Sequence, residues 1–163
     1  MIAGCNKATG QRGFSLIELL VALAILALLA SIAVPFADMA MQRKKEEELR
    51  YALRTIRDAI DEYHHATQDG RLQKMVSGSG YPRKLDVLVE GVEDQQSPTK
   101  KKIYFLRRIP RDPFAPKEEK AADTWGKRSS TSSAEEPREG DDIYDIYSRS
   151  DKVGLNGIPY RQW

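Results

Sequence analysis

A single carboxylate stands near the start of a long apolar run. Residues Gly13 to Pro35 read GFSLIELLVALAILALLASIAVP, and Glu18 is the only charged residue among them. A charge near the end of a membrane helix costs about 2–3 kcal/mol or more unless it is paired, so such an acid is a candidate functional residue. The alternative is that its carboxylate merely reaches the lipid headgroups. The chemistry that Glu18 could perform is therefore charge pairing within a membrane.

The segment before this run is short, polar and basic. MIAGCNKATGQRG contains Lys7 and Arg12 and ends at Gly13. A secretory signal has its apolar segment before the cleavage site, whereas here the apolar run follows the glycine, so cleavage after Gly13 would leave the apolar helix on the mature chain. We expect the basic leader to stay cytoplasmic. The charges of RKKEEE at 43–48 cancel and do not oppose this orientation. An ordinary signal anchor is the alternative from hydropathy alone.

These residues resemble the prepilin-type motif of type IV pilins and type II secretion pseudopilins. The stretch at 13–18 reads GFSLIE, and an uncharged span with Pro35 follows it. In that family a prepilin peptidase cuts after the glycine and methylates the new terminal amine, which implies cleavage after Gly13 and N-methylation of Phe14. The resemblance also implies that Glu18 and Pro35 serve assembly. Glu18 would neutralise the amino terminus of a neighbouring subunit, which lowers the cost of desolvating both charges.

The same resemblance implies a function, a set of partners and a location. The protein is expected to be a structural subunit of the type II secretion pseudopilus, which drives export of folded proteins across the outer membrane. Its partners would be further copies in a helical filament, minor pseudopilins, an inner-membrane assembly platform and the prepilin peptidase. It would cross the bacterial inner membrane once, with its head in the periplasm. A type IV pilus subunit for adhesion or motility is the alternative, and a generic membrane-anchored binding module is disfavoured by the leader.

Composition argues against enzymatic, zinc and nucleic-acid roles. The chain has 26 Lys and Arg against 24 Asp and Glu, a net charge of +2, which leaves no electrostatic footprint for nucleic acid. Cys5 is the single cysteine, and His64 and His65 are adjacent, so zinc ligands do not gather. No base is positioned for catalysis, and we expect no enzyme. Cleavage after Gly13 would remove Cys5, so the mature chain could form no disulfide. Too few residues precede Cys5 for a lipoprotein signal.

The tail SRSDKVGLNGIPYRQW, at 148–163, carries oxygen side chains beside two glycines. A bent loop of this kind could hold calcium, which prefers hard oxygen ligands. Major pseudopilins that resemble this chain bind calcium in a carboxy-terminal loop, and the matching positions are Ser150, Asp151 and Asn156. Asn156 stands where a carboxylate would bind more strongly, and Lys152 adds unfavourable charge. A plain hairpin turn is the alternative.

A long helix must position these groups. Leu19 to Ala37 carries no charge and corresponds to about 28 Å of helix, roughly one bilayer core. Pro35 should kink or loosen the helix. Apolar residues then recur at three- and four-residue spacing, which predicts an amphipathic helix at 38–67, ended by Gly70. A coiled coil is the alternative for this half. The apolar stripe consists of Leu49, Leu53, Ile56, Ile60 and Tyr63.

We predict an α+β fold for the whole chain, with the long N-terminal helix packed on a small antiparallel sheet, as in pilins. The predicted divisions are a leader at 1–13, a transmembrane and filament-core helix at 14–37, and a periplasmic head at 38–163. Within the head we expect a short helix after Pro82, a polar linker at 92–102 and an ordered connector at 103–114. Strands are predicted at 125–129 and 143–148, with a mobile loop at 129–142 between them. The stretches YPRKLDVLVEG and YFLRRIPRDPF together resemble the head of the major pseudopilin.

Overall fold

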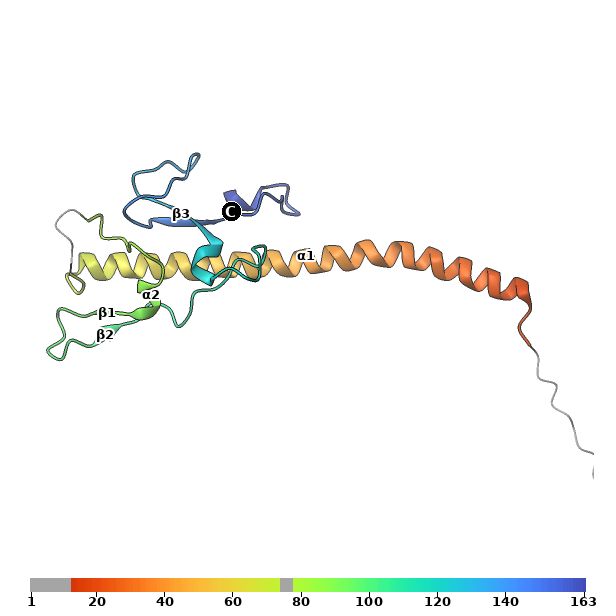
Figure 1. The fold of residues 1–163 in the computed structure, drawn as a ribbon, viewed down its shortest axis with the longest axis horizontal. Coiled ribbons are helices and arrows are strands. Elements are labelled where there is room, and N and C mark those ends of the chain that lie inside the picture. Colours follow the sequence, from red (N-terminus) through yellow and green to blue (C-terminus); the bar gives the residue numbers. More distant parts are fainter. Residues whose placement is uncertain (1–12, 74–77) are drawn as a thin grey trace, which may run out of the picture. The chain divides into compact units, whose positions relative to one another are not determined.

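The computed structural model describes residues 13–73 and 78–163, apart from the side chains of 32–34, and its elements are drawn in Figure 1. The chain divides into two compact units after Met41, and helix α1 (Leu16–Gln68) has residues in both. The predicted boundary between the membrane segment and the head lies close by, at 37 and 38. The predicted leader lies outside the described residues except for Gly13.

The part of α1 in the first unit is apolar and exposed. It contains a stretch long and apolar enough to cross a membrane, and none of that stretch is buried inside the protein. A core helix of a soluble protein would bury such side chains, whereas Leu16 is 77% exposed and Leu23 is 62% exposed. The helix continues through Pro35, so the loss of one backbone donor does not end it. These residues therefore require an apolar environment outside the single chain.

The part of α1 in the second unit confirms the predicted stripe. Leu49, Ile56 and Ile60 are fully buried, and Leu53 is nearly so. The ring of Tyr63 meets that of Phe105 edge to face, with centroids 5.4 Å apart. Facing the stripe lie the other core side chains, namely Leu85, Leu88, Trp125, Ile143, Ile146 and Tyr160.

Gly70 ends α1 as predicted. Its φ of 72° lies in the left-handed region that favours glycine. The Gly70 amide donates to the Thr67 carbonyl at 3.2 Å, and the Arg71 amide donates to the Ala66 carbonyl at 3.0 Å. These two bonds form a Schellman motif, which satisfies carbonyls that the helix end would otherwise leave without donors. Leu72 then turns into the core, where it is 2% exposed.

The predicted second helix is only one turn long. Helix α2 (Val87–Glu90) stops at Gly91, whose φ is 75°. The apolar side that defined the prediction is nevertheless correct for Leu85 and Leu88, which are buried, while Val89 is half-buried. The predicted connector after Ile103 is also ordered, since the amides of Phe105 and Leu106 both donate to the Leu88 carbonyl.

Two separate two-stranded sheets form where one was expected. Strands β3 (Trp125–Arg128) and β4 (Asp145–Ser148) are antiparallel, with Trp125 opposite Ser148, close to the predicted positions. Strands β1 (Val92–Glu93) and β2 (Lys102–Ile103) pair in the same sense, so the predicted linker at 92–102 is wrong. Short 3₁₀ helices η1 (Ala121–Thr124) and η2 (Tyr160–Gln162) complete the described elements. The α+β class, with a long apolar helix and small antiparallel sheets consistent with a pilin-like fold, is confirmed.

The polar composition of 92–102 concealed a turn. The Asp94 carboxylate accepts the Gln96 amide at 3.0 Å, and the Asp94 amide donates to the Lys101 carbonyl at 2.9 Å. An Asp side chain that accepts the amide two residues on mimics a backbone turn. This turn closes the hairpin between β1 and β2. Arg71 fixes the same carboxylate at 2.9 Å, and its hydrogen bond lowers the pKa of Asp94. The turn is thus tied to the end of α1.

The loop at 129–142, expected to be mobile, is fastened at its base. One carboxylate oxygen of Asp142 accepts the Ser129 hydroxyl at 2.6 Å and the Ser130 amide at 2.9 Å, and the other accepts the Ser130 hydroxyl at 2.6 Å. Burial raises the pKa of Asp142, but the hydrogen bonds from Ser129 and Ser130 outweigh it and lower the pKa to about 2. The ionised carboxylate therefore holds the two ends of the loop together.

Candidate functional site

The predicted cleavage point is exposed and non-helical. Gly13 and Phe14 both precede α1, and Phe14 is 76% exposed. Among the described residues, and leaving aside the neighbours of Gly13 in the chain, no atom lies within 4 Å of the place where a Cβ on Gly13 would stand. A protease can reach an exposed, non-helical peptide bond of this kind more easily than one within a helix. The geometry of Gly13 and Phe14 thus suits the predicted processing.

Ser15 caps the start of α1. Its hydroxyl oxygen accepts the Glu18 amide at 3.3 Å, and its carbonyl accepts the Leu19 amide at 3.2 Å. Ser15 is the residue before the first helical one, and Glu18 occupies the third helical position, which is the Ser-x-x-Glu spacing of a capping box. A carboxylate in the first turn is also favoured by the helix dipole. This local role of Glu18 was not predicted from the sequence, although the spacing of Ser15 and Glu18 was a readable signal.

Pro35, the second predicted assembly residue, lies within α1 and is exposed, as is Glu18. The two residues stand on one continuous helix. Within 13–73 and 78–163, Glu18 takes part in none of the ion pairs of the structure.

The predicted calcium ligands lie on a tail hairpin. An isolated bridge joins Val153 to Pro159, and the Gly154 amide donates to the Ile158 carbonyl at 2.9 Å. The Asn156 side-chain oxygen accepts the Ile158 amide at 3.0 Å, which is an Asx turn. The backbone of the tail therefore forms a hairpin, which does not distinguish a plain turn from a calcium loop.

The donor set fits calcium only in part. Ser150 is half-buried, and its hydroxyl accepts the Lys152 amide at 3.3 Å, while Asp151 is exposed and supplies the only carboxylate of the three. Calcium prefers six to eight oxygens, several of them charged. Across 13–73 and 78–163, no three His, Cys, Asp or Glu side chains gather where they could hold a metal ion. Calcium binding by Ser150, Asp151 and Asn156 stays a prediction.

The tail is fastened to α1 by a buried carboxylate that sequence reasoning missed. Glu46 on α1 is 6% exposed, and its Oε1 accepts the Tyr160 hydroxyl at 2.9 Å, the Leu155 amide at 2.8 Å and Gln42 Nε2 at 3.2 Å. Burial, followed by the hydrogen bond to Glu46, raises the pKa of the Tyr160 hydroxyl. Glu46 precedes Leu49 by three residues, so it lies on the apolar stripe, and that position was the available signal.

The last residue is held by two arginines of α1. Arg57 Nη2 donates to the Trp163 carbonyl at 2.8 Å, and its Nε pairs with Asp145 on β4 at 2.8 Å. The guanidinium of Arg50 lies over the Trp163 ring, 4.5 Å from its centroid. Trp163 also meets the buried Tyr160 edge to face at 5.0 Å. Trp163 is therefore packed as part of the head.

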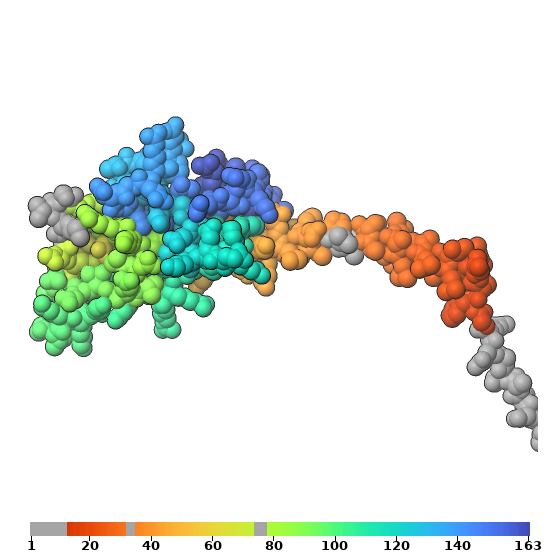
Figure 2. Space-filling view, in the orientation of Figure 1, coloured from red at the N-terminus to blue at the C-terminus, as the bar shows by residue number. Residues whose placement is uncertain are grey.

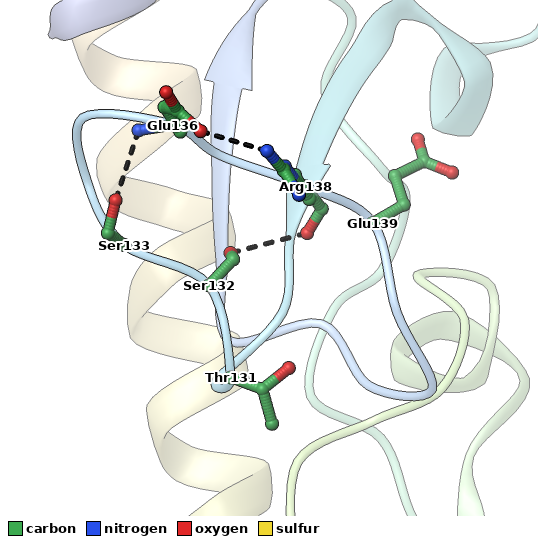
Figure 3. Close-up of a pocket in the computed structure, with 6 residues that line it drawn as sticks. All are labelled: Thr131, Ser132, Ser133, Glu136, Arg138 and Glu139. Atoms are coloured by element: carbon green, nitrogen blue, oxygen red, sulfur yellow. Dashed lines mark hydrogen bonds and ion pairs between the residues drawn. The ribbon is translucent and has the colours of Figure 1, made fainter.

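A shallow pocket in the loop at 129–142 is lined by polar side chains that do not form a catalytic arrangement (Figure 3). The Ser132 hydroxyl donates to the Arg138 carbonyl at 3.3 Å, and Arg138 pairs with Glu136 at 2.9 Å. Both members of that pair are mostly exposed, so the pair is solvated and contributes little to stability.

The comparison with known families adds one finding. A family model described as a prokaryotic N-terminal methylation motif matches residues 9–34. The match includes the predicted cleavage point, Glu18 and most of the apolar part of α1, and it ends before the second unit. No curated protein and no solved structure matches the chain. The N-terminal segment is thus of the prepilin type, the kind that type IV pilin-like proteins carry.

Proposed function

We propose that this protein is a structural subunit of the type II secretion pseudopilus. The observation that carries the proposal is the methylation motif at 9–34, which includes most of the exposed apolar part of α1. The motif indicates a pilin- or pseudopilin-type protein, a family whose members are structural, and it implies processing by a prepilin peptidase. The apolar helix indicates membrane anchoring.

In the proposed mechanism of assembly, the helices of other subunits replace the lipid around α1. In the membrane, lipid covers side chains such as Leu16 and Leu23, and in a filament the same side chains would pack against α1 of other subunits. Methylated Phe14 would carry a cationic amine, and Glu18 of the next subunit would neutralise it. Two opposite charges attract far more strongly in an apolar environment than in water, so this pair would select one register of packing.

Two features of the head support a pseudopilin over a pilus subunit. The stretches YPRKLDVLVEG and YFLRRIPRDPF, whose combination resembles the major pseudopilin, lie together, because the Phe105 and Leu106 amides donate to the Leu88 carbonyl at 3.0 and 2.9 Å. Many type IV pilins close a carboxy-terminal loop with a disulfide, whereas this chain has only Cys5, which the predicted cleavage removes. Here Glu46 and Arg57 hold the tail in place.

Deletion of the gene tests which filament the subunit builds. Loss of secreted proteins with unchanged twitching motility is the expected result. Loss of twitching with an unchanged secreted proteome would instead favour the alternative, a type IV pilus subunit for adhesion or motility. Complementation with the intact gene is the control.

Replacement of Glu18 by Leu tests the assembly step. The variant should insert and be cleaved, since its helix is more apolar, but it should fail to crosslink into filaments because the charge pair is lost. Ser31→Leu is a matched control, since it adds an apolar side chain to the same exposed helix without removing a charge. Filaments of Glu18→Leu in normal amounts would refute the pairing.

A further inference from the structure

The tail hairpin of the head carries exposed aliphatic side chains. Val153, Leu155 and Ile158 are 51%, 45% and 45% exposed, and we call them the apolar tip. In the described part of the second unit, the other large exposed hydrophobic residues are tyrosines, whose hydroxyls suit water. Three aliphatic side chains are thus exposed on one short hairpin of a head that is otherwise highly charged. Exposed apolar patches mark contacts with partners or lipid.

The apolar tip is fixed to the first turns of the helix in this unit. Gln42 Nε2 donates to the Val153 carbonyl at 3.4 Å, and Glu46 Oε1 accepts the Leu155 amide at 2.8 Å. Both bonds go to the backbone of the tip, which leaves its side chains outward. The tail, in dark blue, is seen beside this part of α1 in Figure 2. The backbone of the tip is therefore bonded to α1 at two points.

Gln42 is also close in sequence to the membrane segment. The uncharged span ends at Ala37, and five residues reach at most about 17 Å in any conformation. Arg43 and Lys44, both exposed, follow at once and suit lipid phosphates. Whatever the orientation of the head, the residue that fixes the tip is tethered near the headgroup layer.

We propose that the apolar tip docks on the lipid surface while the subunit is still a monomer in the membrane. The aliphatic side chains would enter the boundary between headgroups and acyl chains, as those of interfacial segments do. This inference rests on membrane anchoring of α1 and not on filament assembly. Docking would hold the head against the bilayer until assembly removes the subunit from the lipid.

Depth-dependent fluorescence on the full chain tests the docking. Leu155→Cys and, as the control, Tyr104→Cys are each made in a Cys5→Ser background, labelled with an environment-sensitive fluorophore and reconstituted in phosphatidylcholine–phosphatidylglycerol vesicles. Tyr104 is 63% exposed and lies directly after β2. Nitroxide lipid headgroups should quench the label at 155 at least about twofold more than the label at 104, and adding Val153→Ser and Ile158→Ser should abolish the difference. These substitutions are on exposed side chains, so the head should stay folded.

The outcomes separate the docking from the anchoring. If the chain does not move with the vesicles in a flotation gradient, both the membrane anchoring and this inference are wrong. A chain that floats with equal quenching at both positions overturns the inference alone. If the fluorophore at position 155 reports an apolar environment only at a high protein-to-lipid ratio, a second copy of the chain covers the tip. The lipid proposal would then be wrong.

Discussion

The buried carboxylate of Glu46 provides the sharpest test of how the tail is held. In Glu46→Ala the Tyr160 hydroxyl and the Leu155 amide both lose their acceptor. Tyr160 is fully buried, so water cannot easily replace the lost partner. Gln42 Nε2, at 3.0 Å, donates to the Tyr160 oxygen and cannot accept its proton.

The expected loss follows from these two donors. A buried donor left without an acceptor costs about 1–3 kcal/mol. The Tyr160 hydroxyl should cost near the upper end, and the Leu155 amide, on an exposed loop, near the lower end. We expect Glu46→Ala to lower the free energy of unfolding by about 2–4 kcal/mol, or the melting temperature by about 4 °C per kcal/mol for a head of this size. Glu46→Gln keeps an acceptor oxygen and should lose about half as much.

Chemical denaturation of the full chain in detergent measures the effect, followed by tryptophan fluorescence. Trp125 and Trp163 both lie in the head, so the signal reports its unfolding. Glu47→Ala is the matched control, because Glu47 is exposed and should change stability by less than about 0.5 kcal/mol. If Glu46→Ala and Glu47→Ala unfold at the same denaturant concentration, the tail is not held by this carboxylate.

Three further predictions concern acid stability, processing and calcium. Because the pKa of Asp142 falls from 3.8 to about 2 on folding, its contribution is complete above about pH 4 and is lost as pH falls towards 2. The pKa difference corresponds to at most about 2.4 kcal/mol, and solvent screening reduces this towards about 1 kcal/mol. Asp142→Asn should therefore weaken the pH dependence of the melting temperature in that window, while Asp141→Asn should not. Gly13→Val should leave only the precursor in intact-mass spectra of cells with prepilin peptidase, whereas the native mature chain should begin at methylated Phe14; a native chain that keeps its leader would contradict this. If the tail binds calcium, the melting temperature of the head should be higher with millimolar calcium than with chelator, and Asp151→Ala should remove the difference. If the melting curves of the native chain with calcium and with chelator coincide, the tail is an ordinary hairpin.

Local signals in the sequence sufficed for the helix. The repeat of Leu49, Leu53, Ile56 and Ile60 predicts a buried face because each residue stands three or four positions from the next, and all four are buried. Gly70 predicts the helix end because glycine adopts the left-handed conformation without strain. Both features depend on neighbours within one or two turns, which is the range over which a sequence pattern is informative.

The hairpin of β1 and β2 could not be read in the same way. Each strand has two residues, too few to show an alternating pattern, and Lys102 and Glu93 are polar. Glu46 was hidden for a related reason, since it stands in a run of charges, and its partners Leu155 and Tyr160 are more than a hundred positions away in the chain. A carboxylate on an apolar stripe is ambiguous until its partner is known. Long-range partners of this kind are set by the tertiary fold.

Non-covalent contacts, and not a disulfide, hold the tail on the head. A disulfide would act mainly on the unfolded chain and would hold even if the helix frayed. The contacts made here by Gln42, Glu46 and Arg57 all start from α1, so they exist only while α1 is helical over those residues. The same contacts must, by reciprocity, stabilise that part of the helix. The tail and the first turns of the helix in the head therefore order each other, and a change at either one should be felt at the other.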